Sequence, residues 1–217
     1  MSLNGRSNEH NLRRFYLHSD GGANSLAGDG WLDQNKPKDD EATDSFIFDP
    51  LNPVPTIGGA VLGPRSGMFA QTIVEARKDV LVYSTKSLEE SVEVTGPVKV
   101  VLYVRSSAQS TDFTAKLVDV FPDGTAYNLS DGIVRGVYEK DKTSEITIEL
   151  WPTSNLFKRG HKIRIEISSS NYPRYNVNPN TGEYIPTATK TLLATQKIFH
   201  TATYSSRIVL PVIPRKR

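Results

Sequence analysis

The sequence predicts an all-β fold, a jelly-roll sandwich of two antiparallel sheets. Three observations support this prediction. Short segments of alternating apolar and polar residues recur along the chain, turn signals separate several of them, and helical periodicity is scarce. A chain of 217 residues with 37% hydrophobic residues can bury a sizeable core. We expect one domain at residues 15–214, a flexible segment or artificial boundary at 1–14, and a basic tail at 215–217.

The first quarter of the chain predicts an edge strand and an extended connector. Residues 1–45 are rich in Gly, Asn, Asp and Ser, with one apolar patch at 15–17. A second patch at 46–48 leads into three prolines within residues 50–55. Because proline fixes φ and lacks a donor for strand pairing, this stretch is expected to cross the surface rather than form a central strand.

From residue 79 onward the pattern predicts regular strands. The clearest is 162–167, where isoleucine at every second position gives one buried face and leaves three charged residues on a face expected to be wet. Further strands are expected at 80–84, 98–104, 113–121, 146–150 and 207–213. Asp-Gly pairs predict tight turns at 20–21, 29–30, 123–124 and 131–132. A short helix is expected within 189–198.

Composition argues against several classes of partner. The formal net charge is only +2, which gives no long-range field toward nucleic acid or an anionic membrane. There is no cysteine, and no apolar run approaches the ~18 residues of a membrane span. We expect a soluble protein, with the cytoplasm slightly favoured and the compartment otherwise open, and we expect no cofactor and no metal.

The chain shows no nucleophile motif of the α/β-hydrolase type. That motif, G-x-S-x-G, exposes a serine on a strained turn between a strand and a helix. The nearest look-alike, residues 63–67, has its serine displaced by one position and no helical pattern behind it. We interpret it as a loop.

Other chemistry-bearing residues have ordinary explanations. No two of the four histidines have metal-binding spacing, and a role in closing turns is favoured over a general base for His161 and His200; the other two are His10 and His18. Three acids could instead supply calcium ligands, although turn capping is favoured; they are Asp112, Asp119 and Asp123.

The segment 168–180 is the most unusual loop. It offers Tyr172, Arg174 and Tyr175 among several asparagines. Aromatic rings and amides together bind sugars, since a ring face stacks on C–H groups while amides meet hydroxyls. Packing against a neighbouring domain is the favoured interpretation, so this is a candidate docking or ligand loop.

Several sequence blocks, in order, closely resemble the C-terminal domain of cocaine esterase-like hydrolases. They are TDFTAKLVDVFPDG at 111–124, DGIVR at 131–135, SSSNYPRY at 168–175, NPNTG at 178–182 and SRIVLPV at 206–212, with 49–59 and DVLVYS at 79–84 also matching. This family of serine hydrolases (CocE/NonD) also includes α-amino acid ester hydrolases, glutaryl acylases and X-Pro dipeptidyl-peptidases.

The resemblance implies a domain without its own catalytic residues. Family members join an α/β-hydrolase domain carrying a Ser-His-Asp triad, a helical cap and a galactose-binding-domain-like jelly roll that packs on both. The positions matching the rim of the acyl pocket are Val61, Leu62 and Gly63. Relatives carry a bulky residue where Gly63 stands, and an acidic residue, glutamine and arginine where 70–72 read Ala-Gln-Thr.

Two functions from different classes follow. The favoured one is a non-catalytic domain that docks on the hydrolase and cap domains of a parent enzyme acting on a small ester, amide or X-Pro peptide. The alternative is a stand-alone carbohydrate-binding module, for which Trp31 and Trp151 are candidate stacking residues. Docking predicts an exposed apolar patch, through which the isolated chain could also form a homodimer.

Overall fold

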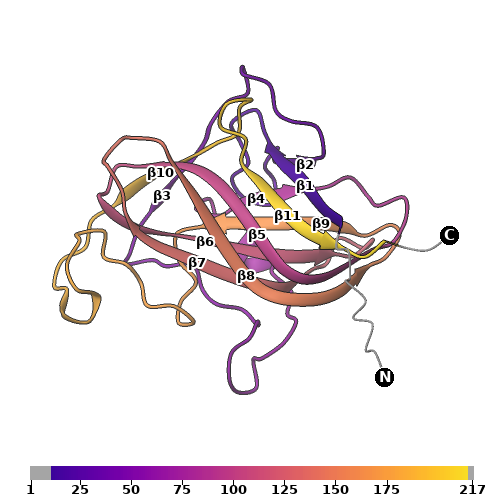
Figure 1. Cartoon of the computed structure of the whole chain (residues 1–217). Helices are drawn as coiled ribbons and strands as arrows, with labels where there is room; N and C mark the ends of the chain where they lie inside the picture. The colour runs from indigo at the N-terminus through magenta and orange to yellow at the C-terminus, as the bar shows by residue number, and fades with distance from the viewer. Residues whose placement is uncertain (1–10, 215–217) are drawn as a thin grey trace, which may run out of the picture.

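The computed structural model describes residues 11–214 and confirms the all-β prediction (Figure 1). Its elements are β1 (Asn11–His18), β2 (Trp31–Asp33), β3 (Asp44–Phe48), α1 (Thr72–Glu75), β4 (Leu81–Ser84), β5 (Val92–Ser106), β6 (Ser110–Val120), β7 (Ala126–Val137), β8 (Ser144–Phe157), β9 (Lys162–Ser168), the 3₁₀ turn η1 (Ile185–Thr187), β10 (Ala194–Phe199) and β11 (Arg207–Val212). Strand β1 begins at Asn11, so residues 11–14 belong to the sheet and not to the N-terminal segment in which the sequence placed them. Within the described range, no helix is long and apolar enough to cross a membrane.

The strands form one continuous sheet that folds into a sandwich. Its order is β3-β10-β5-β11-β1-β2-β4-β9-β6-β7, and β8 pairs with β5. The two predicted sheets are therefore layers joined by hydrogen bonds through the short strand β2. Pairing between named strands is antiparallel except for one parallel pair, Trp31 with Ser84, between β2 and β4.

The core lies between these layers and follows the predicted alternation. In β9, Ile163, Ile165 and Ile167 have no exposed surface, and they pack in one cluster with apolar residues of the other layer such as Ile148. The face of β9 expected to be wet is also covered, because Arg164 and Glu166 are nearly fully buried. That part of the prediction is wrong, and the segments that cover this face are described below.

Two local predictions are also corrected. The segment 189–198 contains no helix, and residues 194–199 instead form β10 between β3 and β5. The Asp-Gly pair at 131–132 lies inside β7 rather than in a turn. Gly132 is needed there for close approach, because a Cβ atom would stand 2.3 Å from the carbonyl oxygen of Glu149. The pair at 123–124 does form the β6–β7 turn, with Gly124 at a φ of +89°.

Candidate functional site

Two long connections cover the outer face of β4, β9 and β6. One is the strap, residues 49–78, and the other is the tyrosine loop, residues 169–180. The two run side by side, since Tyr172 N donates to Val54 O at 2.9 Å and Thr56 N donates to Tyr172 O at 2.6 Å. Val54 N also donates to the Ser170 hydroxyl at 2.9 Å. The strap thereby gains strand-like hydrogen bonds although its prolines exclude it from the sheet.

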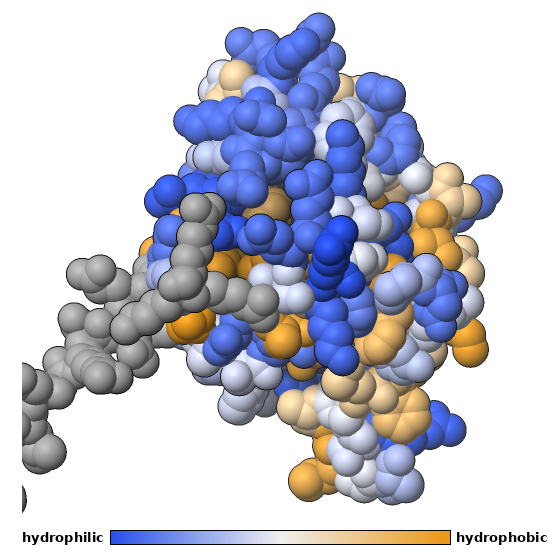
Figure 2. Space-filling model, turned by 90° about the vertical axis from the view of Figure 1, so that its right-hand side faces the viewer, coloured by the Kyte–Doolittle hydropathy of each residue, from blue (hydrophilic) through white to orange (hydrophobic). Residues whose placement is uncertain are grey.

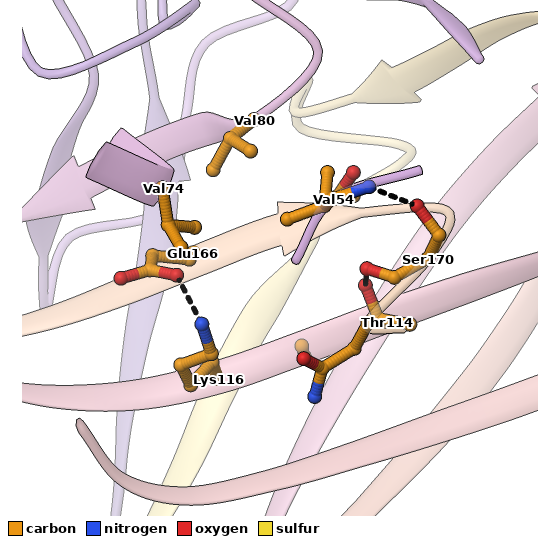
Figure 3. Close-up of a pocket in the computed structure, with 10 residues that line it drawn as sticks. Val54, Val74, Val80, Thr114, Lys116, Glu166 and Ser170 are labelled. Atoms are coloured by element: carbon orange, nitrogen blue, oxygen red, sulfur yellow. Dashed lines mark hydrogen bonds and ion pairs between the residues drawn. The ribbon is translucent and has the colours of Figure 1, made fainter. Parts of the chain in front are cut away.

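Beneath these connections lies a layer of buried charge pairs, here called the polar layer. Arg164 Nη1 lies 2.7 Å from Glu75 Oε2, which joins β9 to α1 of the strap. Lys116 Nζ contacts Glu166 Oε2 at 2.9 Å (Figure 3). The same Nζ donates to Gln71 Oε1 at 2.7 Å. Buried charges are tolerated when they are paired in this way. The pairs explain why the charged face of β9 can be covered.

The cavity in Figure 3 is too small to be an active site. Its volume is about 10 Å³, roughly the space of one water molecule. Three valines, two from the strap and one just before β4, close one side of it. Burial raises the pKa of Glu166 to about 7; the charge of Lys116 opposes this increase and the nearby Glu75 adds to it. The group is a structural carboxyl at the floor of the strap, with no room for a substrate beside it.

The three predicted rim residues lie in the rim loop, residues 59–67. Its base is closed by two reciprocal bonds, Gly59 N to Gly67 O at 2.7 Å and Gly67 N to Gly59 O at 2.9 Å. At the tip Leu62 is fully exposed, Gly63 has a φ of +98° and is also exposed, and Val61 is half-buried. The nucleophile look-alike 63–67 is part of this exposed turn, as predicted for a loop.

Arg174 ties the tyrosine loop to the rim loop. Its Nη1 donates to the carbonyl oxygen of Ala60, and its Nε lies 2.9 Å from Asp131 Oδ1 on β7. The hydroxyl of Tyr175 accepts from the same Nε at 3.2 Å, and both side chains turn inward. Tyr172 is 49% exposed on the outer surface. The structure therefore brings the two predicted groups of site residues together, with Arg174 as the link.

Exposed apolar side chains recur along the surface of the strap and the tyrosine loop. We call this surface the docking face; its exposed members are Leu51, Leu62, Met68, Phe69, Ile73 and Tyr172. In Figure 1 the rim loop is the lowest projection of the described chain, and at the same height Figure 2 shows apolar surface gathered on a protruding lobe. Exposed apolar groups gathered on one surface are typical of an interaction site.

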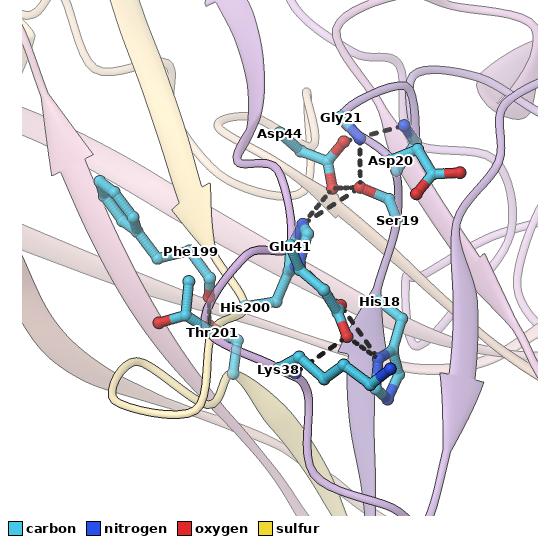
Figure 4. Close-up of polar contacts among 12 residues, drawn as sticks. His18, Ser19, Asp20, Gly21, Lys38, Glu41, Asp44, Phe199, His200 and Thr201 are labelled. Carbon is cyan, nitrogen blue, oxygen red and sulfur yellow. Dashed lines mark hydrogen bonds and ion pairs between the residues drawn. The ribbon is translucent and has the colours of Figure 1, made fainter.

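A buried cluster contains serine, histidine and aspartate but lacks the geometry of a catalytic triad (Figure 4). His200 Nε2 lies 2.9 Å from Asp44 Oδ2 and 3.1 Å from Ser19 Oγ, so Asp44 and the serine share one ring nitrogen. In a triad the acid hydrogen-bonds the ring nitrogen opposite the serine. Here a second acid, Glu41, lies on that side, but its Oε2 is 3.5 Å from Nδ1 and makes no hydrogen bond with it. Ser19 donates directly to Asp44 at 2.7 Å and is fully buried, which excludes a substrate.

Asp44 organises this cluster. Burial alone would raise the pKa of Asp44, but hydrogen bonds from His200, Tyr83, Ala23 and Ser19 outweigh that effect and lower it. Sequence reasoning singled out His200 and missed Asp44, because the residues that meet here are separated by up to 181 positions. The only local signal was the position of Asp44, a charged residue that alternates with Phe46 and Phe48 on the buried face of β3.

The other sequence candidates also have structural roles. His161 Nδ1 lies 2.9 Å from Asp119 Oδ1, and His18 pairs with Glu41 and stacks on Trp31 at 5.1 Å between ring centroids. Asp112 is paired with an arginine of β7, while Asp123 caps its turn. The three acids thus do not converge, and residues 11–214 contain no group of three potential metal ligands. His10 lies outside the described residues, and Trp151 is 63% exposed.

Comparison with known proteins gives a consistent result. The family model described as the X-Pro dipeptidyl-peptidase C-terminal non-catalytic domain matches residues 4–209. The chain is 43% identical to cocaine esterase of Rhodococcus sp. (strain MB1 Bresler) over 93% of its own length and 37% of that enzyme's length.

Solved structures agree at the level of the fold. An aminopeptidase from the marine sediment archaeon Thaumarchaeota archaeon superposes with a TM-score of 0.82 at 27% identity, over 94% of this chain and 37% of that one. An α-amino acid ester hydrolase gives a TM-score of 0.78 at 24% identity, over 92% and 36%. The chain spans about a third of the length of each of these relatives.

Proposed function

Because this chain belongs to the family of X-Pro dipeptidyl-peptidase C-terminal non-catalytic domains, we propose that it docks on the α/β-hydrolase and cap domains of a serine hydrolase within the same parent chain. The parent would act on a small ester, amide or X-Pro peptide. The observation that carries this proposal is the docking face, a set of exposed apolar residues on two connections. The polar layer fixes the strap to the sandwich, and the tyrosine loop is held by its backbone bonds to the strap and by the contact of Arg174 with Asp131.

The construction of the face supports a role in docking. Flexible loops lose conformational entropy when they bind, and loops already held in place avoid that cost. Here Arg174 holds the base of the rim loop, and Gln71 N donates to Ala126 O at 2.9 Å beside α1. The exposed Ile73 lies on α1 itself. The apolar groups are therefore presented by a largely preformed surface.

The rim loop supports a contribution to the substrate pocket. Val61, Leu62 and Gly63 form a tip that projects from the sandwich, and the side chain of Leu62 is fully exposed. We propose that Leu62 inserts beside the substrate's acyl group and that Gly63, lacking a side chain, leaves more space there than the bulky residue of relatives would. The loop would then shape the pocket without performing chemistry.

Reconstitution tests the docking proposal. The hydrolase and cap domains of the parent would be supplied as a separate chain, and their binding to this chain measured by calorimetry. Leu62→Asp and Ile73→Asp should each weaken binding about tenfold or more, since each places a charge in an apolar contact. Trp151→Asp, an exposed apolar residue outside the face, is the matched control and should bind like the unmodified chain.

Activity provides a second readout. Hydrolysis of a p-nitrophenyl ester panel and of an Ala-Pro anilide should require the catalytic domains and rise when this chain is added. Unchanged binding by both face variants would contradict the proposal. If the face instead mediates a homodimer, sedimentation of the isolated chain would show a dimer that Leu62→Asp dissociates, with no binding to the catalytic domains.

A further inference from the structure

A second surface site lies away from the docking face, where the end of the tyrosine loop passes the β6–β7 hairpin. It is a pocket of about 410 Å³. Its walls come from the start of β6, from β7, from the tyrosine loop and from the turn η1; the lining residues are Ser110, Arg135, Asn176, Asn178, Glu183, Tyr184, Ile185 and Pro186. A volume of this size is within the range of small-molecule sites.

The floor of the pocket is fixed by an ion pair whose carboxylate is buried. Asp112 is 1% exposed, and Arg135 binds it through Nε at 3.0 Å and Nη2 at 2.7 Å. The same Nη2 donates to Asn176 O at 2.7 Å, and the buried Asn178 donates to Asp112 Oδ1 at 2.8 Å. These contacts set the direction of the guanidinium group before any ligand arrives.

Several polar groups of the lining remain unused. Within residues 11–214, no hydrogen bond engages Arg135 Nη1, the Ser110 hydroxyl or the side-chain amide of Asn176. Together they offer donors and acceptors of the kind that hydroxyl groups bind. Tyr184, immediately before η1, also lines the pocket and has 75% of its surface exposed, which leaves its ring available for stacking.

The charge balance selects the class of ligand. Asp112 already neutralises Arg135, and Glu183 adds a carboxylate at the wall, so an anionic ligand would be repelled. We propose that this pocket binds a neutral, hydroxyl-rich ring of the size of a monosaccharide. Its C–H face would stack on Tyr184, and its hydroxyls would meet Arg135 Nη1, Asn176 and Ser110.

The site differs from the one that the sequence suggested for sugars. Arg174 and Tyr175 turn inward toward Asp131 and the rim loop, so they form no open platform. Trp151 is exposed on β8, outside the pocket. The proposal is independent of docking on catalytic domains, because the pocket uses none of the exposed apolar residues of the docking face.

Titration of the ¹⁵N-labelled chain with D-glucose, D-galactose and D-mannose, followed by amide chemical shifts, tests the proposal. At least one sugar should give saturable shifts confined to residues near 110, 135, 176–178 and 183–186. Tyr184→Ala should weaken binding about two- to tenfold through lost stacking, and Asn176→Ala should also weaken it. Trp151→Ala is the control and should bind like the unmodified chain.

The outcomes separate clearly. Asn176→Ala leaves intact the backbone oxygen that Arg135 uses, and Tyr184 is exposed, so both variants should keep the native spectrum elsewhere. Saturable shifts that persist in Tyr184→Ala, or that centre on Tyr172 or Trp151, would overturn the assignment. So would the absence of saturable shifts with all three sugars, and so would tighter binding of glucuronate than of glucose.

Discussion

Arg164 and Glu75 form an ion pair 2.7 Å long that is almost completely buried between β9 and the short helix of the strap. Neither residue can lose its partner without leaving an isolated charge in the interior. The pair is therefore a strong tether for the strap, although a pair of apolar residues of similar volume could fill the same space.

Arg164→Leu should destabilise the chain by about 3–5 kcal/mol, because Glu75 would remain buried and unpaired. The double variant Arg164→Leu with Glu75→Leu should regain most of that loss. Urea unfolding followed by tryptophan fluorescence measures both. Equal stability of the single and double variants would show that the pairing itself contributes little.

Glu166 predicts a pH-dependent stability. Burial raises its pKa from 4.5 to about 7 in the folded chain, so between these values the folded state binds more protons than the unfolded state. The contribution of Glu166 is thus fully present below pH 4.5 and is lost as the pH rises through about 7. Glu166→Gln should remove this dependence, so its unfolding free energy relative to the unmodified chain should increase across the same window. A constant difference would contradict the assignment.

Arg174 predicts the accessibility of the rim loop to protease. Arg174→Ala removes the contacts to Ala60 and Asp131, and should increase the rate of tryptic cleavage after Arg65 about tenfold or more. Lys142→Ala, in an exposed turn far along the chain, is the control. This variant should be cleaved after Arg65 at the native rate. Mass spectrometry of the fragments identifies the cut. No acceleration would mean that the Gly59–Gly67 bonds hold the loop without Arg174.

The geometry of the Ser19 cluster predicts that Ser19 does not react as a nucleophile. Because Ser19 is buried and shares one histidine nitrogen with Asp44, a fluorophosphonate probe should not label it in the folded chain. Asp44→Ala should destabilise the fold by about 3 kcal/mol or more, since four donors would lose their acceptor. Labelling of Ser19 at a rate above that of the urea-unfolded chain would refute this interpretation.

The sequence predicted the strands far better than what covers them. The isoleucines of 162–167 identified both a strand and its core face, because burial of one face leaves a local period of two. Arg164 and Glu166 can be buried because they pair with Glu75 and Lys116, which lie far away along the chain. No local pattern could therefore reveal that this face of β9 is buried.

The errors at 189–198 and 131–132 have the same origin. Residues 194–199 become a strand because β3 and β5 flank them, not because of their own propensity. Glycine is required at position 132 by the close approach of the Glu149 backbone on β8, and not by a turn. The rim and tyrosine-loop residues came from a family resemblance and an unusual composition, but neither could show that Arg174 bridges the two groups.

The strap has two faces of opposite character, with charge pairs inside and apolar groups outside. Lys116 contacts only the interior, yet through Gln71 it sets the position of the segment that carries Phe69 and Ile73. In a parent enzyme, the damage from changing such a residue would be seen first in how the assembled enzyme handles its substrate. A screen that ranked positions by distance from the substrate would therefore overlook the residues that hold this surface in register.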